Sequence, residues 1–169
     1  RDRALGGSVA STIVLTVSYD GRGFAGFARQ PGLVTVQGQL ESALATALRH
    51  DVETVGAGRT DAGVHALEQV VSLEWDERYL DRAALLRSLN ALVGEGIVVT
   101  GIREAPVGFS ARHSAVGREY RYRIVPGPVP PLFLAPVSWW LKGTLDLGAM
   151  REAAEALIGE HDFRSFCVA

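Results

Sequence analysis

Two hydrophobic periodicities follow one another along the first part of the chain, and their order is the feature that most constrains the fold. Strands are expected over 13–19, 53–57, 71–75 and 97–102. Apolar residues recur every three or four positions from Val36 to Leu48 and from Leu85 to Leu92, as on one face of an amphipathic helix. The resulting order, β-α-β-β-α-β, predicts an α+β fold of the ferredoxin-like split βαβ type. Such a unit is an antiparallel sheet with both helices on one face, and we expect its other face to be open to a ligand.

The ends of both helices carry capping signals. Thr35 is a suitable N-cap for the first helix, and Asp81 for the second. Arg49 and His50 follow the first helix and place cations at its negative end.

A second set of elements starts after Pro106. Its first strand is expected to place Tyr120, Tyr122 and Ile124 on one side and Arg121 and Arg123 on the other. The five prolines from Pro126 to Pro136 predict a stiff loop, and a further strand is expected over 137–141.

Asp146 then caps a third helix that ends at Gly159. Its inward side chains are expected to be Leu147, Met150, Leu157 and Ile158. The sequence stops at Ser165–Ala169, where another strand is expected, and it begins at Arg1 without an initiator methionine. We therefore expect a partial chain with an N-terminal ferredoxin-like half, 8–105, and an incomplete second half with a basic strand, 106–169.

Size and composition restrict the class of protein. The chain has 169 residues, of which 47% are hydrophobic and 21% charged, and a chain of this size buries roughly 70% of its unfolded surface. No apolar run approaches the ~20 residues that span a bilayer, so no membrane association is expected. Cys167 is the only cysteine, which excludes an internal disulfide framework, and no secretory signal precedes the first strand. A cytoplasmic location fits these features best.

The net charge of −2 argues weakly against a nucleic-acid partner. Four arginines nevertheless lie within twelve positions that contain one acid, Glu119; they are Arg112, Arg118, Arg121 and Arg123. Arginine suits bidentate phosphate contacts and stacking. The alternative interpretation is an ordinary solvated strand face.

The segment 57–66 places one acid beside one arginine in a glycine-flanked turn. Gly58 and Gly63 permit positive φ and close approach of the backbone to a ligand, so the turn can present Asp61 outward. A carboxylate can act as a covalent nucleophile without a cofactor. The alternative is a plain reverse turn in which Asp61 accepts backbone hydrogen bonds and Arg59 pairs with it on the surface.

Other kinds of site lack their signatures. The histidines His50, His65, His113 and His161 are scattered, so the spacing predicts no metal site. Gly56-Ala57-Gly58 lacks the third glycine of a dinucleotide fingerprint, no phosphate loop or nucleophile elbow is present, and we expect no cofactor. Tyr120 is either a structural tyrosine of the sheet or an aromatic ring that stacks on a base between arginines.

Six motifs occur in an order that resembles the TruA family of tRNA pseudouridine synthases. They are Tyr19-Asp20-Gly21-x-x-Phe24-x-Gly26-Phe27-x-Arg29-Gln30, Thr35-Val36-Gln37-Gly38-x-Leu40-Glu41, Ala57 to Ala66, Leu89-Asn90-Ala91, Phe109-x-Ala111-Arg112-x-Ser114-Ala115-x-x-Arg118-x-Tyr120-Arg121-Tyr122, and Gly159-x-His161-Asp162-Phe163-x-Ser165-Phe166. The resemblance covers residues 19–166, so it is far more specific than the turn alone.

The resemblance implies a metal-free and cofactor-free enzyme that converts uridine to pseudouridine at positions 38, 39 and 40 of the tRNA anticodon stem-loop. Asp61 matches the catalytic aspartate, which attacks C1′ of the ribose or C6 of the base. Arg59 matches the arginine that helps open the stem and hold the flipped nucleotide, and Tyr120 matches the tyrosine that packs against the target uracil. Arg112, Arg118 and Arg121 then lie where phosphate contacts are expected.

The sequence departs from the family pattern at its end. Family members continue for roughly half as much chain again, which completes the second half of the pseudouridine synthase fold and supplies a basic residue that pairs with the catalytic aspartate. The resemblance also implies a homodimer. Three alternatives stay open: an inactive fragment of such an enzyme, a non-catalytic RNA-binding module, and an unrelated hydrolase with a carboxylate nucleophile, for which no second acid is evident.

Overall fold

The computed structural model describes residues 11–75 and 81–166. The chain divides into two compact units, Arg1–Arg118 and Glu119–Ala169. Cys167 lies outside the described residues, as does most of the strand expected over 165–169. Among the described residues, no helix combines the length and the apolar character that crossing a bilayer requires.

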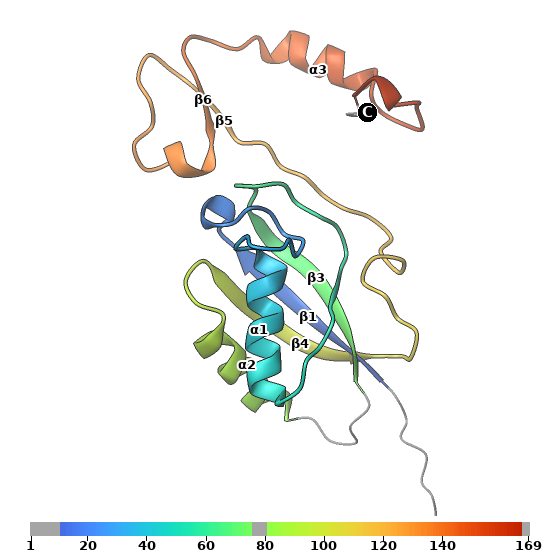
Figure 1. The fold of residues 1–169 in the computed structure, drawn as a ribbon. Helices are drawn as coiled ribbons and strands as arrows, with labels where there is room; N and C mark the ends of the chain where they lie inside the picture. Colours follow the sequence, from blue (N-terminus) through green and yellow to red (C-terminus); the bar gives the residue numbers. More distant parts are fainter. Residues whose placement is uncertain (1–10, 76–80, 167–169) are drawn as a thin grey trace, which may run out of the picture. The chain divides into compact units, whose positions relative to one another are not determined.

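The first unit contains a four-stranded antiparallel sheet. Its strands are β1 (Ser11–Tyr19), β2 (Val55–Gly56), β3 (Ala66–Trp75) and β4 (Ile97–Ala105). Their order in the sheet is β2-β3-β1-β4, with β1 paired to both β3 and β4 (Figure 1). This is the strand order of a split βαβ unit, so the predicted fold class is confirmed.

Both helices of the unit begin where their capping residues predict. In α1 (Val36–Leu48), the Thr35 hydroxyl accepts a hydrogen bond from the Gly38 N–H at 3.2 Å. In α2 (Arg82–Leu92), the Asp81 carboxylate accepts from the Ala84 N–H at 2.9 Å. Each bond satisfies a backbone donor that the first turn of a helix leaves free.

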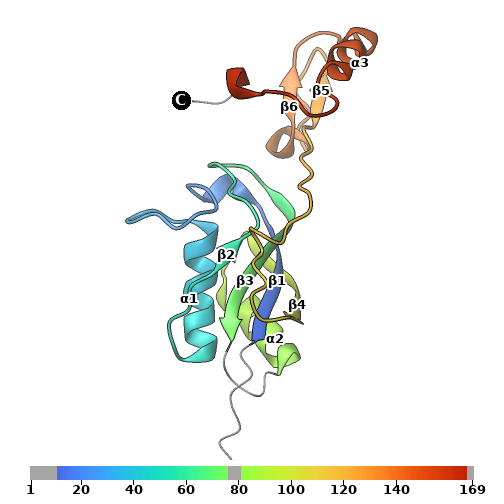
Figure 2. The same cartoon turned by 90° about the vertical axis from the view of Figure 1, so that its right-hand side faces the viewer.

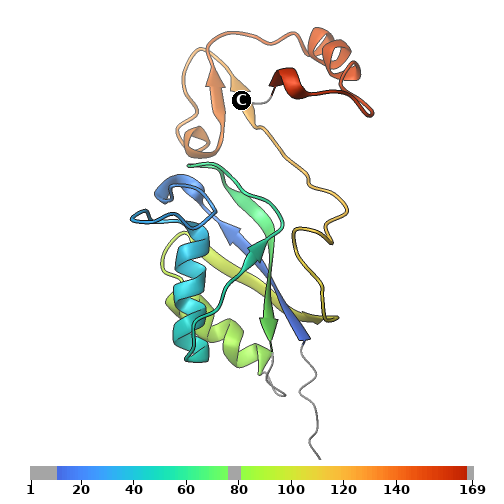
Figure 3. The same cartoon turned by 45° about the vertical axis from the view of Figure 1, so that its right-hand side comes forward.

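The helices lie on one face of the sheet, as predicted (Figure 3). Alternate side chains of β1 point toward them, and Ile13, Leu15 and Val17 are almost completely buried. They pack with apolar residues of both helices, among them Leu40 and Leu89. The alternate apolar side chains of β1 and the apolar faces of α1 and α2 therefore form one core.

The other face of the sheet is not open along its whole length. The segment after β4 returns along that face (Figures 2 and 3), and the Ala111 N–H donates to the Ser72 hydroxyl at 3.0 Å. Ala111 and Val14 are buried, and the Arg103 guanidinium lies 5.3 Å from the centre of the Phe109 ring. The expectation of an open second face is therefore wrong for this part, because small residues there allow the chain to pack closely against it.

The second unit contains two short parallel strands, β5 (Ile124–Pro126) and β6 (Trp139–Leu141). The basic strand that was expected to begin near Tyr120 begins only at Ile124, and residues 115–123 lie in no helix or strand. In the described part of the chain, no strand pairs with residues 118–122. Alternation alone does not make a strand without a neighbour to accept its hydrogen bonds.

The third helix, α3 (Leu147–Glu155), is capped as predicted but is not buried. The Asp146 carboxylate accepts from the Gly148 and Ala149 N–H groups at 2.9 and 3.0 Å. The side chains expected to point inward are exposed; they are Leu147, Met150, Leu157 and Ile158. The expected burial is wrong because none of the described residues of this unit is buried, so the helix has no packed layer beneath its apolar side.

Candidate functional site

The turn between β2 and β3 is held at its base by backbone and side-chain hydrogen bonds. The Ala57 N–H donates to the Val70 carbonyl at 2.8 Å, and the Gln69 side-chain amide donates to the Gly58 carbonyl at 2.7 Å. Gly63 has φ +80°, the left-handed conformation that favours glycine. The two ends of the turn are therefore fixed by the strands that it joins.

Thr60 anchors the tip of the turn. Its carbonyl accepts from the Phe27 N–H at 2.9 Å, and its hydroxyl lies 2.8 Å from the hydroxyl of Tyr19. Tyr19 is a buried residue at the end of β1. The residue immediately before Asp61 is thus tied to both the sheet and the segment that follows β1.

Two glycines allow the turn to pack directly on the backbone of residues 21–26. A Cβ on Gly21 would lie 2.1 Å from the Val64 carbonyl oxygen. A Cβ on Gly26, which has φ +113°, would lie 3.0 Å from the Thr60 carbonyl oxygen. Both glycines occur in the first of the six motifs, but no sequence pattern indicates this close contact.

Asp61 is exposed at the tip of this fixed turn. Its carbonyl accepts from the Val64 N–H at 3.2 Å, whereas its carboxylate makes no hydrogen bond or ion pair with any residue that the structure describes. The plain reverse turn, with the carboxylate bonded to the backbone or to Arg59, is therefore not the arrangement in the structure. The acid is held in place by its backbone and is free to react with a ligand.

Asp61 and Arg59 line the same hollow, which has a volume of about 340 Å³. Residues 25–30 form its other wall, and Thr60 and Ala62 complete it. A larger hollow of about 580 Å³ shares none of these residues, and Arg22 in its lining is already paired with Asp20. In the smaller hollow the unpaired acid Asp61 and the cation Arg59 lie on one fixed turn, so this hollow is the candidate site.

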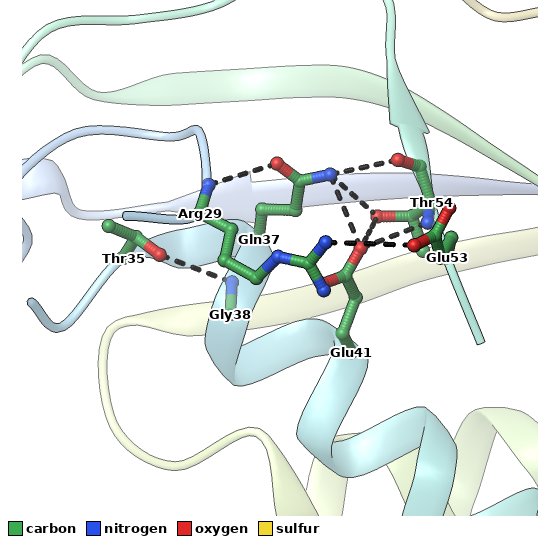
Figure 4. A network of polar contacts seen from close by, with 7 residues as sticks. All are labelled: Arg29, Thr35, Gln37, Gly38, Glu41, Glu53 and Thr54. Carbon is green, nitrogen blue, oxygen red and sulfur yellow. Dashed lines mark hydrogen bonds and ion pairs between the residues drawn. The ribbon is translucent and has the colours of Figure 1, made fainter. Parts of the chain in front are cut away.

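A buried carboxylate on α1 supports the wall of this hollow (Figure 4). Glu41 accepts from the Thr54 N–H and hydroxyl, each at 2.9 Å, and forms an ion pair with Arg29 at 3.1 Å. Gln37 accepts from the Arg29 N–H at 3.0 Å and donates to the Thr54 carbonyl at 2.8 Å. Thr54 precedes β2 and Arg29 lies in the wall, so the network joins both sides of the site to one helix. The second motif contains Gln37 and Glu41, but no sequence pattern indicates that Glu41 is buried.

The far end of the turn contacts a carboxylate that follows β1. His65 Nδ1 lies 3.2 Å from the Asp20 carboxylate, which also pairs with Arg22. The Arg22 guanidinium, hydrogen-bonded to Asp20, holds the pKa of that carboxyl well below its usual range. Asp20 therefore stays ionised at neutral pH, and His65 lies beside this carboxylate.

The predicted arginines have different surroundings. The Arg112 side chain is exposed and has no partner among the described residues, whereas the Arg118 guanidinium donates to the Ala57 and Arg112 carbonyls. Arg121 belongs to the second unit and pairs with Glu119 at 3.2 Å.

Tyr120, in the same unit as Arg121, is 68% exposed, which rules out a buried structural role in this unit. Among the described residues, no group of three or more potential ligands could hold a metal ion.

The glycine contacts predict a clear difference between two neighbouring substitutions. Gly21→Ala should destabilise the protein by more than about 2 kcal/mol, because its methyl group meets a backbone carbonyl that cannot move alone. Gly23→Ala, in the same 3₁₀ helix and with open space around its Cβ, is the matched control and should change stability by less than about 0.5 kcal/mol. Urea denaturation of both variants measures the difference, and equal effects would contradict the close approach.

The Glu41 network gives a second prediction. Glu41→Ala should lower the free energy of unfolding by about 2–4 kcal/mol, because it leaves the buried Thr54 N–H without an acceptor. Glu53 also pairs with Arg29, at 3.8 Å, but its side chain is 90% exposed. Glu53→Ala should therefore cost less than about 0.5 kcal/mol. Urea denaturation again measures both, and a Glu41→Ala protein as stable as Glu53→Ala would show that the network does not stabilise the fold.

Comparison with known proteins supports the resemblance found in the motifs. No family model matches the sequence. Three curated relatives are named tRNA pseudouridine synthase A: those of Chromobacterium violaceum, 47% identical over 91% of this chain, Rhizobium meliloti, 44% over 90%, and Methylobacillus flagellatus, 41% over 91%. The alignments cover 59%, 62% and 59% of these relatives, so the chain spans about six-tenths of their length. The similarity to the TruA family is thereby confirmed.

Proposed function

Because this chain is homologous over nine-tenths of its length to part of tRNA pseudouridine synthase A, we propose that it carries the catalytic aspartate of a tRNA pseudouridine synthase. The observation that carries the proposal is the unpaired Asp61 carboxylate, held on a fixed turn beside Arg59 in a hollow. The finer proposal, from the motifs, is that the target uridines are positions 38, 39 and 40 of the anticodon stem-loop.

The proposed reaction is an isomerisation, so it neither adds nor removes atoms overall. In one route the Asp61 carboxylate bonds to C1′ of the ribose, and the electron pair of the C1′–N1 bond leaves with the uracil. In the other route the carboxylate adds to C6 of the base, the electron pair of the C5–C6 double bond moves toward C5 and O4, and the C1′–N1 bond then breaks with its electron pair on N1. In both, the uracil turns, C5 bonds to C1′, the carboxylate is released, the C5 proton is lost and N1 gains a proton. A carboxylate suffices as nucleophile, and no cofactor is proposed.

The neighbouring side chains have proposed roles in binding. A paired uridine must leave its stack before Asp61 can reach it. Arg59 lies in the same hollow and is proposed to hold the flipped nucleotide. Tyr120 is proposed to pack against the uracil, as its exposed ring permits.

Phosphate contacts are proposed for Arg112 and Arg121. The whole chain is slightly acidic, so attraction to RNA has to come from local arginines. The Arg112 side chain has no partner among the described residues, and the single ion pair of Arg121 is solvent-exposed and weak. We also propose, from the family resemblance, a homodimer and a cytoplasmic location, where the tRNA substrate is found.

The proposal predicts that Asp61→Asn abolishes pseudouridine formation while tRNA binding survives. The amide keeps the shape of the side chain but is not a nucleophile. Asp51→Asn, at another exposed acid, is the control and should retain activity. The measurement is pseudouridine mapping of an unmodified anticodon stem-loop after incubation with protein expressed from the complete gene.

Turnover by Asp61→Asn at more than about a hundredth of the unaltered rate would contradict the nucleophile assignment, because loss of a covalent catalyst costs far more. Binding without turnover by the unaltered protein would instead favour the non-catalytic RNA-binding module.

The phosphate contacts predict a change in salt dependence. Arg112→Gln combined with Arg121→Gln should weaken tRNA binding and reduce the slope of log K against log salt by about two, because each lost contact releases about one counterion fewer. Arg87→Gln, on the exposed side of α2, is the charge-matched control. Filter binding between 50 and 200 mM salt, a window in which several phosphate contacts produce roughly a thousandfold effect, measures the slope. An unchanged slope would indicate that these arginines form only a solvated surface.

A further inference from the structure

Arg118 differs from the other arginines of its segment because its guanidinium is engaged with the protein. Its Nε donates to the Ala57 carbonyl at 3.0 Å, and its Nη2 donates to the same oxygen. The Nη2 group also lies 3.4 Å from the Arg112 carbonyl. The forked edge that could bind a phosphate is therefore directed at the backbone where the turn begins.

The contact gives Ala57, the first residue of the turn, hydrogen bonds on both its backbone N–H and its carbonyl. The Ala57 N–H already donates to Val70 in β3, and its carbonyl accepts from Arg118. A Cβ on the next residue, Gly58, would lie 3.3 Å from Arg118 Nε, so the guanidinium lies directly against the turn backbone. Both backbone polar groups of Ala57, two residues before Arg59, are thus hydrogen-bonded.

The segment that carries Arg118 is itself anchored to the sheet. Its Ala111 is buried, and the Ala111 N–H donates to Ser72 in β3. Arg118 therefore reaches the turn from a segment that is fixed to the same sheet. A guanidinium that served only to attract RNA would not need this anchor.

We propose that Arg118 is a positioning residue: it fixes the start of the turn and thereby places the Asp61 carboxylate. The effect on catalysis rests on the proposed function, whereas the effect on the turn does not. The proposal replaces the phosphate contact that the family resemblance implies for Arg118, and it leaves that role to Arg112 and Arg121.

The test uses Arg118→Lys, with Arg87→Lys as the matched control, in protein expressed from the complete gene. Lysine keeps the positive charge that attracts phosphate but lacks the two-donor fork. We expect Arg118→Lys to lower kcat about ten- to hundredfold, as small misplacements of catalytic groups do. KM and the salt slope of tRNA binding should stay unchanged, and Arg87→Lys should behave as the unaltered protein.

Hydrogen–deuterium exchange gives a readout that does not depend on activity. In Arg118→Lys, the peptide covering residues 57–66 should exchange at least several-fold faster, while β1 and α1 exchange at the unaltered rate. Comparison within one sample separates a local change from general unfolding. Arg118→Gln, which removes the charge as well, should show the same exchange pattern, again with an unchanged salt slope.

Two outcomes would overturn the proposal. One is normal exchange of the turn in Arg118→Lys. The other is a salt slope reduced by about one in Arg118→Gln together with normal kcat in Arg118→Lys, because this pattern identifies a phosphate contact. If the unaltered protein forms no pseudouridine, the proposed function fails, but the exchange measurement still decides whether Arg118 fixes the turn.

Discussion

The candidate site depends on the direct contact between two stretches of backbone. The turn after β2 lies so close to residues 21–26 that no side chain fits at Gly21. Backbone is stiffer than side chains, so this contact fixes the turn more firmly than a side-chain layer would. Thr60 and its bonds to Phe27 and Tyr19 then settle where the next residue, Asp61, lies. Sites built on such supported elements hold their reactive groups with the precision that catalysis requires.

The first half of the fold was predictable because its signals are local and agree with one another. The spacing of Ile13, Leu15 and Val17 identifies the buried face of β1, and Thr35 and Asp81 mark where the helices begin. In a split βαβ unit, these signals leave few alternative topologies. The local signal for Asp61 was weaker, because an acid between glycines also fits a plain reverse turn, and it was the order of the six motifs that favoured a functional role.

Other features had no periodic signal. The segment after β4 covers part of the second face of the sheet, where the Ala111 N–H donates to the Ser72 hydroxyl. No pattern in the sequence indicates this contact. The burial of Glu41 was also unforeseen, because an acid on a helix is usually solvated. In the second unit, the alternation around Tyr120 was real, but strand pairing is a long-range property that short sequence patterns do not contain.

An exposed, unpaired carboxylate is a hydrated one. Water around Asp61 has to leave before the carboxylate can approach a carbon atom, and the removal of a charge from water is costly. The lining of the hollow contains two arginines, but Arg29 is paired with Glu41, and Arg59 does not pair with Asp61 in the part of the chain that the structure describes. Little in the protein therefore offsets this cost beforehand. In the proposed reaction, RNA contacts made elsewhere on the surface supply the free energy that desolvation of the Asp61 carboxylate requires. A short oligonucleotide that fills the hollow but misses those contacts would therefore be a poor substrate even though it carries the correct uridine.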